Sequence, residues 1–162
     1  MLIRNMTASD WDEVQRLYAY ARDFMRRHGN PDQWRDVSPR KELTLSDIEN
    51  GTGYVVEEDG ALPAAFALPG GEDPTYARIY DGAWHYDRPY GTIHRIASYG
   101  GRGAASAAIR WCGERFDYLR IDTHRDNVPM RNLVKKTGFS YCGRIYIADG
   151  TERLAFDRLA LK

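Results

Sequence analysis

The stretch from Ile93 to Cys112 constrains the fold of this chain more than any other. Ile93–Ala97 is a short apolar run that suits a buried strand. Three glycines between residues 100 and 103 then favour a turn with positive φ, and Ala104–Cys112 is an Ala-rich run of high helix propensity. A strand, a glycine turn and a helix N-terminus in succession gather unpaired backbone N–H groups at one point. That arrangement favours an anion such as a phosphate, although such turns also occur without a ligand.

Length and composition limit the class of protein. A chain of 162 residues suits one domain, 1–162, with its own core, and 43% hydrophobic and 28% charged residues are typical of a globular protein. Lys+Arg and Asp+Glu both number 23, which argues against a nucleic-acid partner bound through bulk positive charge. Neither a signal peptide nor an apolar run of about 18 residues is visible. We therefore expect a cytoplasmic protein that binds no membrane.

The two cysteines, Cys112 and Cys142, are far apart and show no CxxC spacing. This pattern predicts free thiols in a reducing compartment rather than a disulfide, and it predicts no metal site.

Strands and helices are predicted along the whole chain. Helical spacing of apolar residues over 11–25 predicts a first helix, with Ser9 and Asp12 as its capping box. A second helix is predicted to begin at Ser38-Pro39 and to end at Gly51. Strands are predicted at Leu2–Ile3, Gly53–Glu58, Ala64–Leu68, Tyr118–Thr123, Tyr141–Ile147 and Arg153–Leu159, with hairpin turns at 59–60 and 149–150. The sum is a mixed α/β fold, with a hairpin-rich sheet and helices on its faces.

The segment after Thr123 predicts a short helix with clear ends. Asn127 is a plausible N-cap, and Pro129 fits the first turn. Gly138 suits the C′ position, with Val134 and Phe139 placed for the accompanying apolar contact.

Two markers in this order resemble the GNAT family of N-acetyltransferases. The family's pyrophosphate motif is Gln/Arg-x-x-Gly-x-Gly/Ala, and here Gly103 and Ala105 fill its last two positions. Gly100 stands where Gln or Arg is usual, which is a departure from the pattern. The second marker is a strand followed by Asn, a helix and a closing Gly-Phe, which here is the segment 120–139.

The resemblance covers residues 92–139 and implies a fold and a reaction. It implies a central, mostly antiparallel, twisted sheet of six or seven strands flanked by about four helices. It also implies acetyl-CoA (coenzyme A) as cosubstrate, without a metal, and a primary amine of a small molecule, amino acid or peptide as acceptor.

Coenzyme A carries a pyrophosphate on a peptide-like pantetheine arm. Backbone N–H groups of 101–106 can hold the pyrophosphate, and the exposed backbone of 96–98 can pair with the arm like an added strand. Asn127 matches the family asparagine that contacts the arm, although an N-cap explains it equally well. The residues expected to bind acetyl-CoA are Ile96, Ala97, Ser98, Gly101, Arg102, Gly103, Ala104, Ala105, Ser106 and Asn127.

His94 is the expected catalytic base. It stands where family members often place a Glu, and an ordinary histidine pKa of about 6.5 suits a base near neutrality. A purely structural role for His94 is an equal alternative. Asp122 and His124 are candidates to assist His94 as the base or to replace it. Many relatives also carry a Tyr as general acid, but Val134 occupies that position here. Tyr141 and Tyr90 are available as substitutes, and we assign no general acid from the sequence.

An aromatic pocket is expected to bind the acceptor, because aromatic rings can hold a cation or an apolar group. The expected walls are Trp34, Tyr76, Trp84 and Tyr90. Packing in the core or in a homodimer interface is the alternative for each of them. Glu72, Asp73 and Asp81 are candidates to attract the positive charge of an amine.

Two other functions remain open from the sequence alone. The departures at Gly100 and Val134 are compatible with a catalytically silent acyl-CoA-binding module or sensor. A purely structural or partner-binding domain would bind no coenzyme A. A P-loop hydrolase is disfavoured, because no Lys-Ser/Thr follows the glycines.

Overall fold

The computed structural model describes residues 1–160 and contains a seven-stranded sheet in the order β1-β2-β3-β4-β5-β7-β6. The strands are β1 (Leu2–Asn5), β2 (Gly53–Glu58), β3 (Ala61–Ala67), β4 (Gly91–Ser98), β5 (Tyr118–Thr123), β6 (Ser140–Tyr146) and β7 (Glu152–Leu159). The helices are α1 (Trp11–Arg27), α2 (Lys41–Glu49), α3 (Ala104–Arg115) and α4 (Val128–Lys136), with short 3-10 turns η1 (Ala8–Asp10) and η2 (Pro74–Tyr76). The expected mixed α/β fold, with a mostly antiparallel sheet and about four helices, is confirmed.

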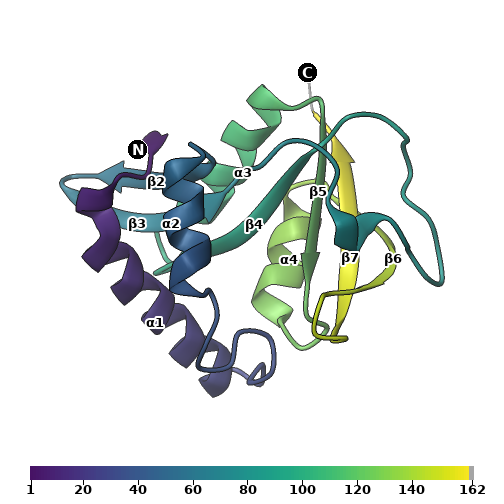
Figure 1. Cartoon of the computed structure of the whole chain (residues 1–162), viewed down its shortest axis with the longest axis horizontal. Helices are drawn as coiled ribbons and strands as arrows, with labels where there is room; N and C mark the ends of the chain where they lie inside the picture. The colour runs from purple at the N-terminus through teal and green to yellow at the C-terminus, as the bar shows by residue number, and fades with distance from the viewer. Residues whose placement is uncertain (161–162) are drawn as a thin grey trace.

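Helices cover both faces of the sheet (Figure 1). On one face, Val14 and Leu17 of α1 pack with Val55 and Ala65 of β2 and β3. A second cluster on the sheet contains buried residues of α3 and α4 together with Leu119 and Ile121 of β5. Its helical members are Ala104, Ala108, Ile109, Cys112 and Val134. None of the described helices is long and apolar enough to cross a membrane.

The second half of β4 is paired with another strand on one side only. β4 and β5 are the one parallel pair among the described strands, and their pairing runs only from Gly91↔Leu119 to Ile93↔Ile121. Beyond this point the two strands splay apart (Figure 1). The edge of residues 94–98 that faces away from β3 therefore has no partner strand.

A bulge in β4 lies where the strands separate. The register with β3 shifts between Ala65↔Ala97 and Ala67↔His94, and Arg95 has a positive φ of 51°. Asp47 of α2 holds the Arg95 guanidinium through two hydrogen bonds of 3.0 and 2.7 Å. A bulge re-aims the side chains around it, here those on either side of Arg95.

The first helix begins at Trp11, as predicted, but its capping box and the start of the second helix were predicted wrongly. The capping box is Thr7 with Asp10 at the start of η1, which leads into α1, and not Ser9 with Asp12. The Asp10 carboxylate accepts the Thr7 N–H at 2.8 Å and also binds Arg4. The second helix begins at Lys41 rather than at residues 38–39, because Arg40 is still extended (φ −64°, ψ 143°).

The helix after β5 has the predicted ends. The Asn127 side chain accepts the N–H of Met130 at 3.2 Å. At the other end Gly138 has φ 91°, and the Phe139 N–H donates to the Val134 carbonyl at 2.9 Å, as in a Schellman motif.

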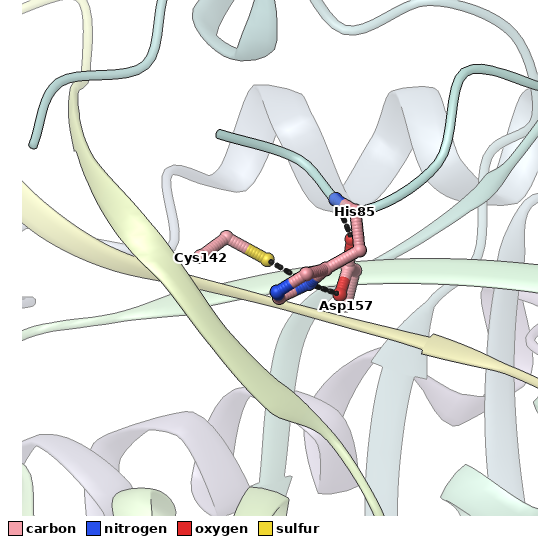
Figure 2. Close-up of side chains that lie close together, drawn as sticks. All are labelled: His85, Cys142 and Asp157. Atoms are coloured by element: carbon pink, nitrogen blue, oxygen red, sulfur yellow. Dashed lines mark hydrogen bonds and ion pairs between the residues drawn. The ribbon is translucent and has the colours of Figure 1, made fainter. Parts of the chain in front are cut away.

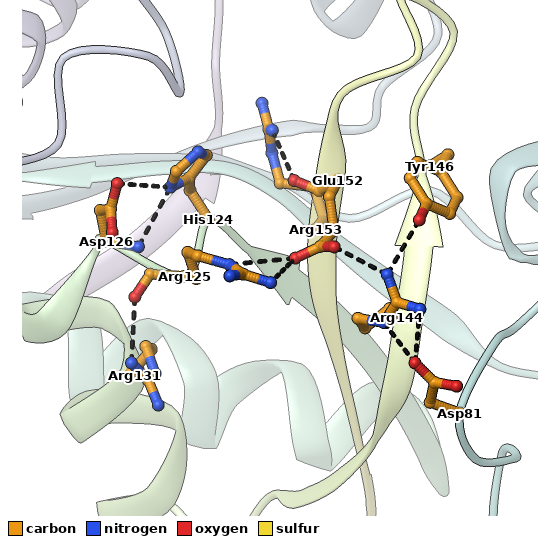
Figure 3. A network of polar contacts seen from close by, with 9 residues as sticks. All are labelled: Asp81, His124, Arg125, Asp126, Arg131, Arg144, Tyr146, Glu152 and Arg153. Atoms are coloured by element: carbon orange, nitrogen blue, oxygen red, sulfur yellow. Dashed lines mark hydrogen bonds and ion pairs between the residues drawn. The ribbon is translucent and has the colours of Figure 1, made fainter.

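The segment from residue 77 to residue 90 packs on the strands β5, β7 and β6. Tyr80 exchanges two backbone hydrogen bonds with Arg144, of 2.9 and 2.8 Å. The Arg144 side chain binds Asp81 at 2.7 Å and Glu152 at 2.8 Å, and Arg125 binds Glu152 at 3.1 Å, which gives a network on this surface (Figure 3). Asp81, a candidate to attract the amine, therefore binds Arg144 in this network.

Three buried or half-exposed side chains attach the same segment to β6 and β7 (Figure 2). The His85 ring nitrogen Nδ1 lies 2.7 Å from Asp157 Oδ1 and 3.3 Å from Cys142 Sγ. Asp157 Oδ2 accepts the His85 N–H and the Tyr118 hydroxyl, at 2.8 and 2.7 Å. Although burial raises the pKa of the Asp157 carboxyl, these hydrogen bonds hold it below its usual value.

Histidine, cysteine and aspartate are metal-ligand types, and these three groups lie close enough to share an ion. However, both Asp157 oxygens are occupied by hydrogen bonds within the protein, and burial raises the pKa of the Cys142 thiol. We therefore interpret the cluster as an anchor of the 77–90 segment. Both cysteines are free thiols, as predicted.

Candidate active site

The N-terminus of α3 presents a row of backbone N–H groups. Gly103 is its N-cap and has the left-handed conformation (φ 70°, ψ 17°), and a Cβ added there would meet no atom within 4 Å. The first helical hydrogen bond runs from Ala107 N to Gly103 O, at 3.0 Å. The N–H groups of residues 101–106 donate to no atom of the chain between residues 1 and 160. They are therefore free to bind an anion.

A groove leads from this turn along the open edge of β4. It is a cavity of about 190 Å³ between β4, α1 and α4. Its lining includes Tyr20, Ala21, Phe24, Met25, Ile96, Ala97, Ser98, Tyr99, Gly100, Ala105, Asn127, Pro129, Met130 and Leu133. Four of the residues expected to bind the coenzyme arm, at positions 96, 97, 98 and 127, thus line one groove. Tyr20, Tyr99 and Met130 were not predicted, because their contribution depends on how α1 and α4 pack.

A wider cavity of about 720 Å³ opens from the inner end of the groove. Residues common to the two linings are Met25, Ile96, Asn127 and Met130, so the cavities adjoin. The wider cavity lies where β4 and β5 splay, and His94 and Asp122 are the first residues of each strand after their last pair.

His94 has a carboxylate partner that the sequence did not indicate as such. Its Nε2 lies 2.7 Å from Asp73 Oδ2, in the loop before η2. Asp73 Oδ1 accepts the backbone N–H and the hydroxyl of Thr75, at 2.9 and 2.7 Å. Although burial raises the pKa of Asp73, the hydrogen bonds from His94 and Thr75 hold it at about 2. Asp73 is therefore ionised at neutral pH, and Nε2 carries the proton that faces it.

Asp122 and His124, the other candidate partners, make different contacts. Asp122 Oδ2 accepts the hydroxyl of Tyr76 at 2.6 Å, and burial with this carboxylate raises the pKa of the Tyr76 hydroxyl. His124 Nδ1 accepts the Asp126 N–H at 3.0 Å (Figure 3), and burial beside Arg153 lowers the pKa of His124. Of these two, only Asp122 lines the wider cavity.

The four expected aromatic walls divide between two cavities. Trp34 lines the wider cavity and packs edge-on against Tyr18. Tyr76, Trp84 and Tyr90 line a neighbouring cavity of about 1020 Å³, where Trp84 and Tyr90 enclose the Arg120 guanidinium at 4.1 Å from each ring centroid.

The rings of Tyr76, Trp84 and Tyr90 do not line the wider cavity, and hydrogen bonds connect them to it. Asp73 lines both cavities, and its N–H donates to the Tyr90 hydroxyl at 2.8 Å. Tyr76 is 2% exposed and reaches the wider cavity only through its hydrogen bond to Asp122. Trp84 donates to the Tyr76 carbonyl at 3.0 Å.

The remaining predicted side chains lie on the rim or outside both cavities. Arg102 is exposed, 3.8 Å from Glu58, and can approach a phosphate at the turn. Val134, at the family's acid position, is fully buried. Tyr141 packs against Phe156 outside the two cavities that hold His94 and the groove.

Gln33 connects the parts of the site, and no sequence signal pointed to it. Its side-chain oxygen accepts from Asn127 Nδ2 at 2.9 Å, and its carbonyl accepts from Arg153 Nη2 at 3.1 Å. The loop between α1 and α2 is thereby tied to α4 and β7 around the cavity.

No family model matches the sequence, and no curated protein does either. Among solved structures, an acetyltransferase of the GNAT family from Streptococcus agalactiae is 32% identical, with a TM-score of 0.89, over 99% of this chain and 96% of that one. The chain belongs to the GNAT family of acetyltransferases.

More distant GNAT structures share the fold. One from Listeria monocytogenes is 17% identical with a TM-score of 0.72, over 98% of this chain and 94% of that chain. The NatB acetyltransferase complex bound to CoA contains a chain that is 12% identical with a TM-score of 0.67, over 99% of this chain and 100% of that chain. This GNAT protein is thus an acyltransferase, as expected, and its family carries out acetyl transfer.

Proposed function

We propose that this GNAT protein transfers the acetyl group of acetyl-CoA to a primary amine of a small molecule, amino acid or peptide. The observation that supports this proposal is a continuous path through the structure. It runs from the unbonded N–H groups of residues 101–106 along the groove beside β4 to His94 in the adjoining cavity. In this proposal, the phosphate-bearing cosubstrate and the amine meet where β4 and β5 separate.

The residues present fit coenzyme A. Six free N–H groups suit a pyrophosphate, so a Gln or Arg at position 100 is not needed for charge recognition. The unpaired edge of residues 96–98 suits the amides of pantetheine. Bound there, acetyl-CoA supplies an acyl group activated as a thioester.

His94 acts as the base in this proposal. Because Nε2 faces the Asp73 carboxylate, Nδ1 carries the lone pair that can accept a proton from the amine. Asp73 positions the ring and stabilises its protonated form, and is itself held in place by Thr75.

The unpaired edge of β4 can donate an N–H to the thioester carbonyl, which stabilises negative charge that develops on that oxygen. No acid is assigned. A thiolate with a conjugate-acid pKa of about 8.5 can leave without one.

A thiol-release assay over a panel of primary amines tests the proposal, with acetyl-CoA hydrolysis as background. We expect release above background that depends on the amine, together with an acetylated product detected by mass spectrometry. Release that is independent of every amine would contradict the proposal. A silent acyl-CoA-binding module would instead bind acetyl-CoA in a thermal-shift experiment and release nothing.

A further inference from the structure

Arg153 is a buried cation that faces the wider cavity without a carboxylate partner. It is 5% exposed and lines this cavity. Its Nη1 donates to the Glu152 carbonyl at 3.0 Å (Figure 3). Its Nη2 donates to the Gln33 carbonyl at 3.1 Å. No acidic side chain within the described part of the chain lies within ion-pair distance of it. Asp122 and Asp149 favour its charge only from beyond ion-pair distance, and burial outweighs them and lowers the pKa of Arg153. A carboxylate in direct contact would therefore stabilise the guanidinium.

The other arginines near the site differ from Arg153. Half-buried Arg95 lines the same cavity but is neutralised by Asp47. Arg120 is buried and also lacks a carboxylate, but it lies between the Trp84 and Tyr90 rings in the neighbouring cavity. Arg158 also lacks a carboxylate, but it lies over the Phe139 ring and does not line the cavity.

One unsatisfied group lies in the same lining. The Thr123 hydroxyl is buried and makes no hydrogen bond to any described residue. Thr123 pairs with Leu154, the residue after Arg153, across the β5–β7 ladder, so the Thr123 and Arg153 side chains leave opposite faces of the sheet. The hydroxyl is therefore a polar group of the lining that is separate from Arg153.

The charges around the cavity favour a zwitterion over a simple anion. Its lining has four carboxylates (Glu42, Asp73, Asp122 and Asp149) against three arginines (Arg40, Arg95 and Arg153). Within the described residues, the Asp122 carboxylate accepts one hydrogen bond, from the Tyr76 hydroxyl, and forms no ion pair, so a negative group lies close to the His94 end. A dianionic phosphate would be repelled by this excess of carboxylates, whereas a monoanionic carboxylate matches one guanidinium.

We propose that the acceptor is a free amino acid, whose carboxylate binds Arg153, while its amine lies between His94 and Asp122. This inference rests on the proposed N-acetyltransferase function. Apolar lining from Trp34, Leu43 and Ile147 provides space for a hydrophobic side chain.

The test compares each amino acid with its own amide in the wild-type enzyme, for example leucine with leucinamide and phenylalanine with phenylalaninamide. The amide keeps the shape and removes the charge. For each side chain that is accepted, we expect kcat/KM for the acid to exceed that for the amide at least tenfold. The α-amine of an amino acid amide loses its proton more easily than that of the free amino acid, which by itself favours the amide as acceptor. A preference for the acid would therefore have to overcome this effect.

Equal or better use of the amides, or of peptide N-termini, would overturn the inference while leaving the proposed function standing. If no amine of any kind is acetylated, the proposed function itself fails. The two failures are therefore distinguishable.

Variants at position 153 separate recognition from structure. We expect Arg153→Gln to raise KM for the amino acid at least tenfold and to leave KM for the amide unchanged, with partial rescue by Arg153→Lys. Arg125→Gln, which removes an exposed arginine from the neighbouring network, is the matched control and should change neither value. Equal losses on acid and amide in Arg153→Gln would show a purely structural role and overturn the assignment.

Discussion

His94 Nε2 lies 2.7 Å from Asp73 Oδ2, although the two residues come from a strand and from the loop that precedes η2. Both Asp73 oxygens are engaged, one by His94 and the other by Thr75, and the Asp73 N–H is held by Tyr90. The histidine is thus not isolated within the sheet. Its tautomer is fixed by a rigid carboxylate at the place where an acceptor would bind.

The first prediction concerns this pair. Asp73→Asn removes the charge that orients and stabilises the protonated ring, and His94→Ala removes the base itself. We expect each to lower kcat by about tenfold or more with little change in the Kd of acetyl-CoA. Glu72→Gln, which changes an exposed neighbouring acid, is the control and should be silent. Wild-type kcat in both His94→Ala and Asp73→Asn would remove the pair from catalysis.

The second prediction concerns acid stability. The pKa of Asp73 is about 2 in the folded protein, below the ordinary value of 3.8, so the ionised carboxylate stabilises the fold. This contribution is fully present above about pH 4 and is lost as the pH falls toward 2. In urea titrations, the free energy of unfolding of wild type minus that of Asp73→Asn should therefore decrease between pH 5 and pH 2.5. A difference that is constant with pH would contradict this account.

The third prediction concerns the glycine turn. Gly103 and Gly51 have similar left-handed conformations, with φ of 70° and 67°, and both have open space around the Cβ position. Replacing either by Glu should cost about 1–2 kcal/mol of folding free energy. Only Gly103→Glu places a carboxylate beside the free N–H groups, so only this variant should lose acetyl-CoA binding by calorimetry. Equal affinity in the two variants would count against the turn as the phosphate site.

The fourth prediction concerns the anchored segment before β4. A Cβ at Gly82 would lie 1.9 Å from the Cys142 carbonyl oxygen, whereas a Cβ at Gly70 meets only the Phe116 ring at 3.3 Å. Gly82→Ala should therefore destabilise the protein by about 1–3 kcal/mol, and Gly70→Ala by less. Thermal unfolding of the two variants measures this. The reverse order would show that this segment is not packed as tightly as described.

Local features of the fold could be predicted from the sequence. The glycine turn, the Asn127 cap and the Gly138 helix end each depend on residues within one or two turns of one another, so short-range chemistry specifies them. The first capping box was misplaced because Ser9 and Thr7 both offer a suitable hydroxyl, and only the contact of Asp10 with Arg4 decides between them.

The site could be predicted only in part for the opposite reason. Asp73 and His94 are 21 residues apart, and Gln33 and Arg153 are 120 apart. No periodicity or motif links such pairs, because the splay of β4 and β5 and the loop after α1 bring them together. In the same way, the spacing of Trp84 and Tyr90 could not show that these two rings enclose Arg120.

The central claim is that free amide hydrogens at the start of α3 recognise the phosphates of coenzyme A. A ¹H–¹⁵N NMR titration observes these hydrogens directly, with pantetheine as the matched ligand that lacks phosphates. Coenzyme A should shift the amide resonances of residues 101–106 together with those of residues 96–98, while pantetheine should leave residues 101–106 unchanged. Saturating coenzyme A that leaves the resonances of residues 101–106 in place would contradict the account.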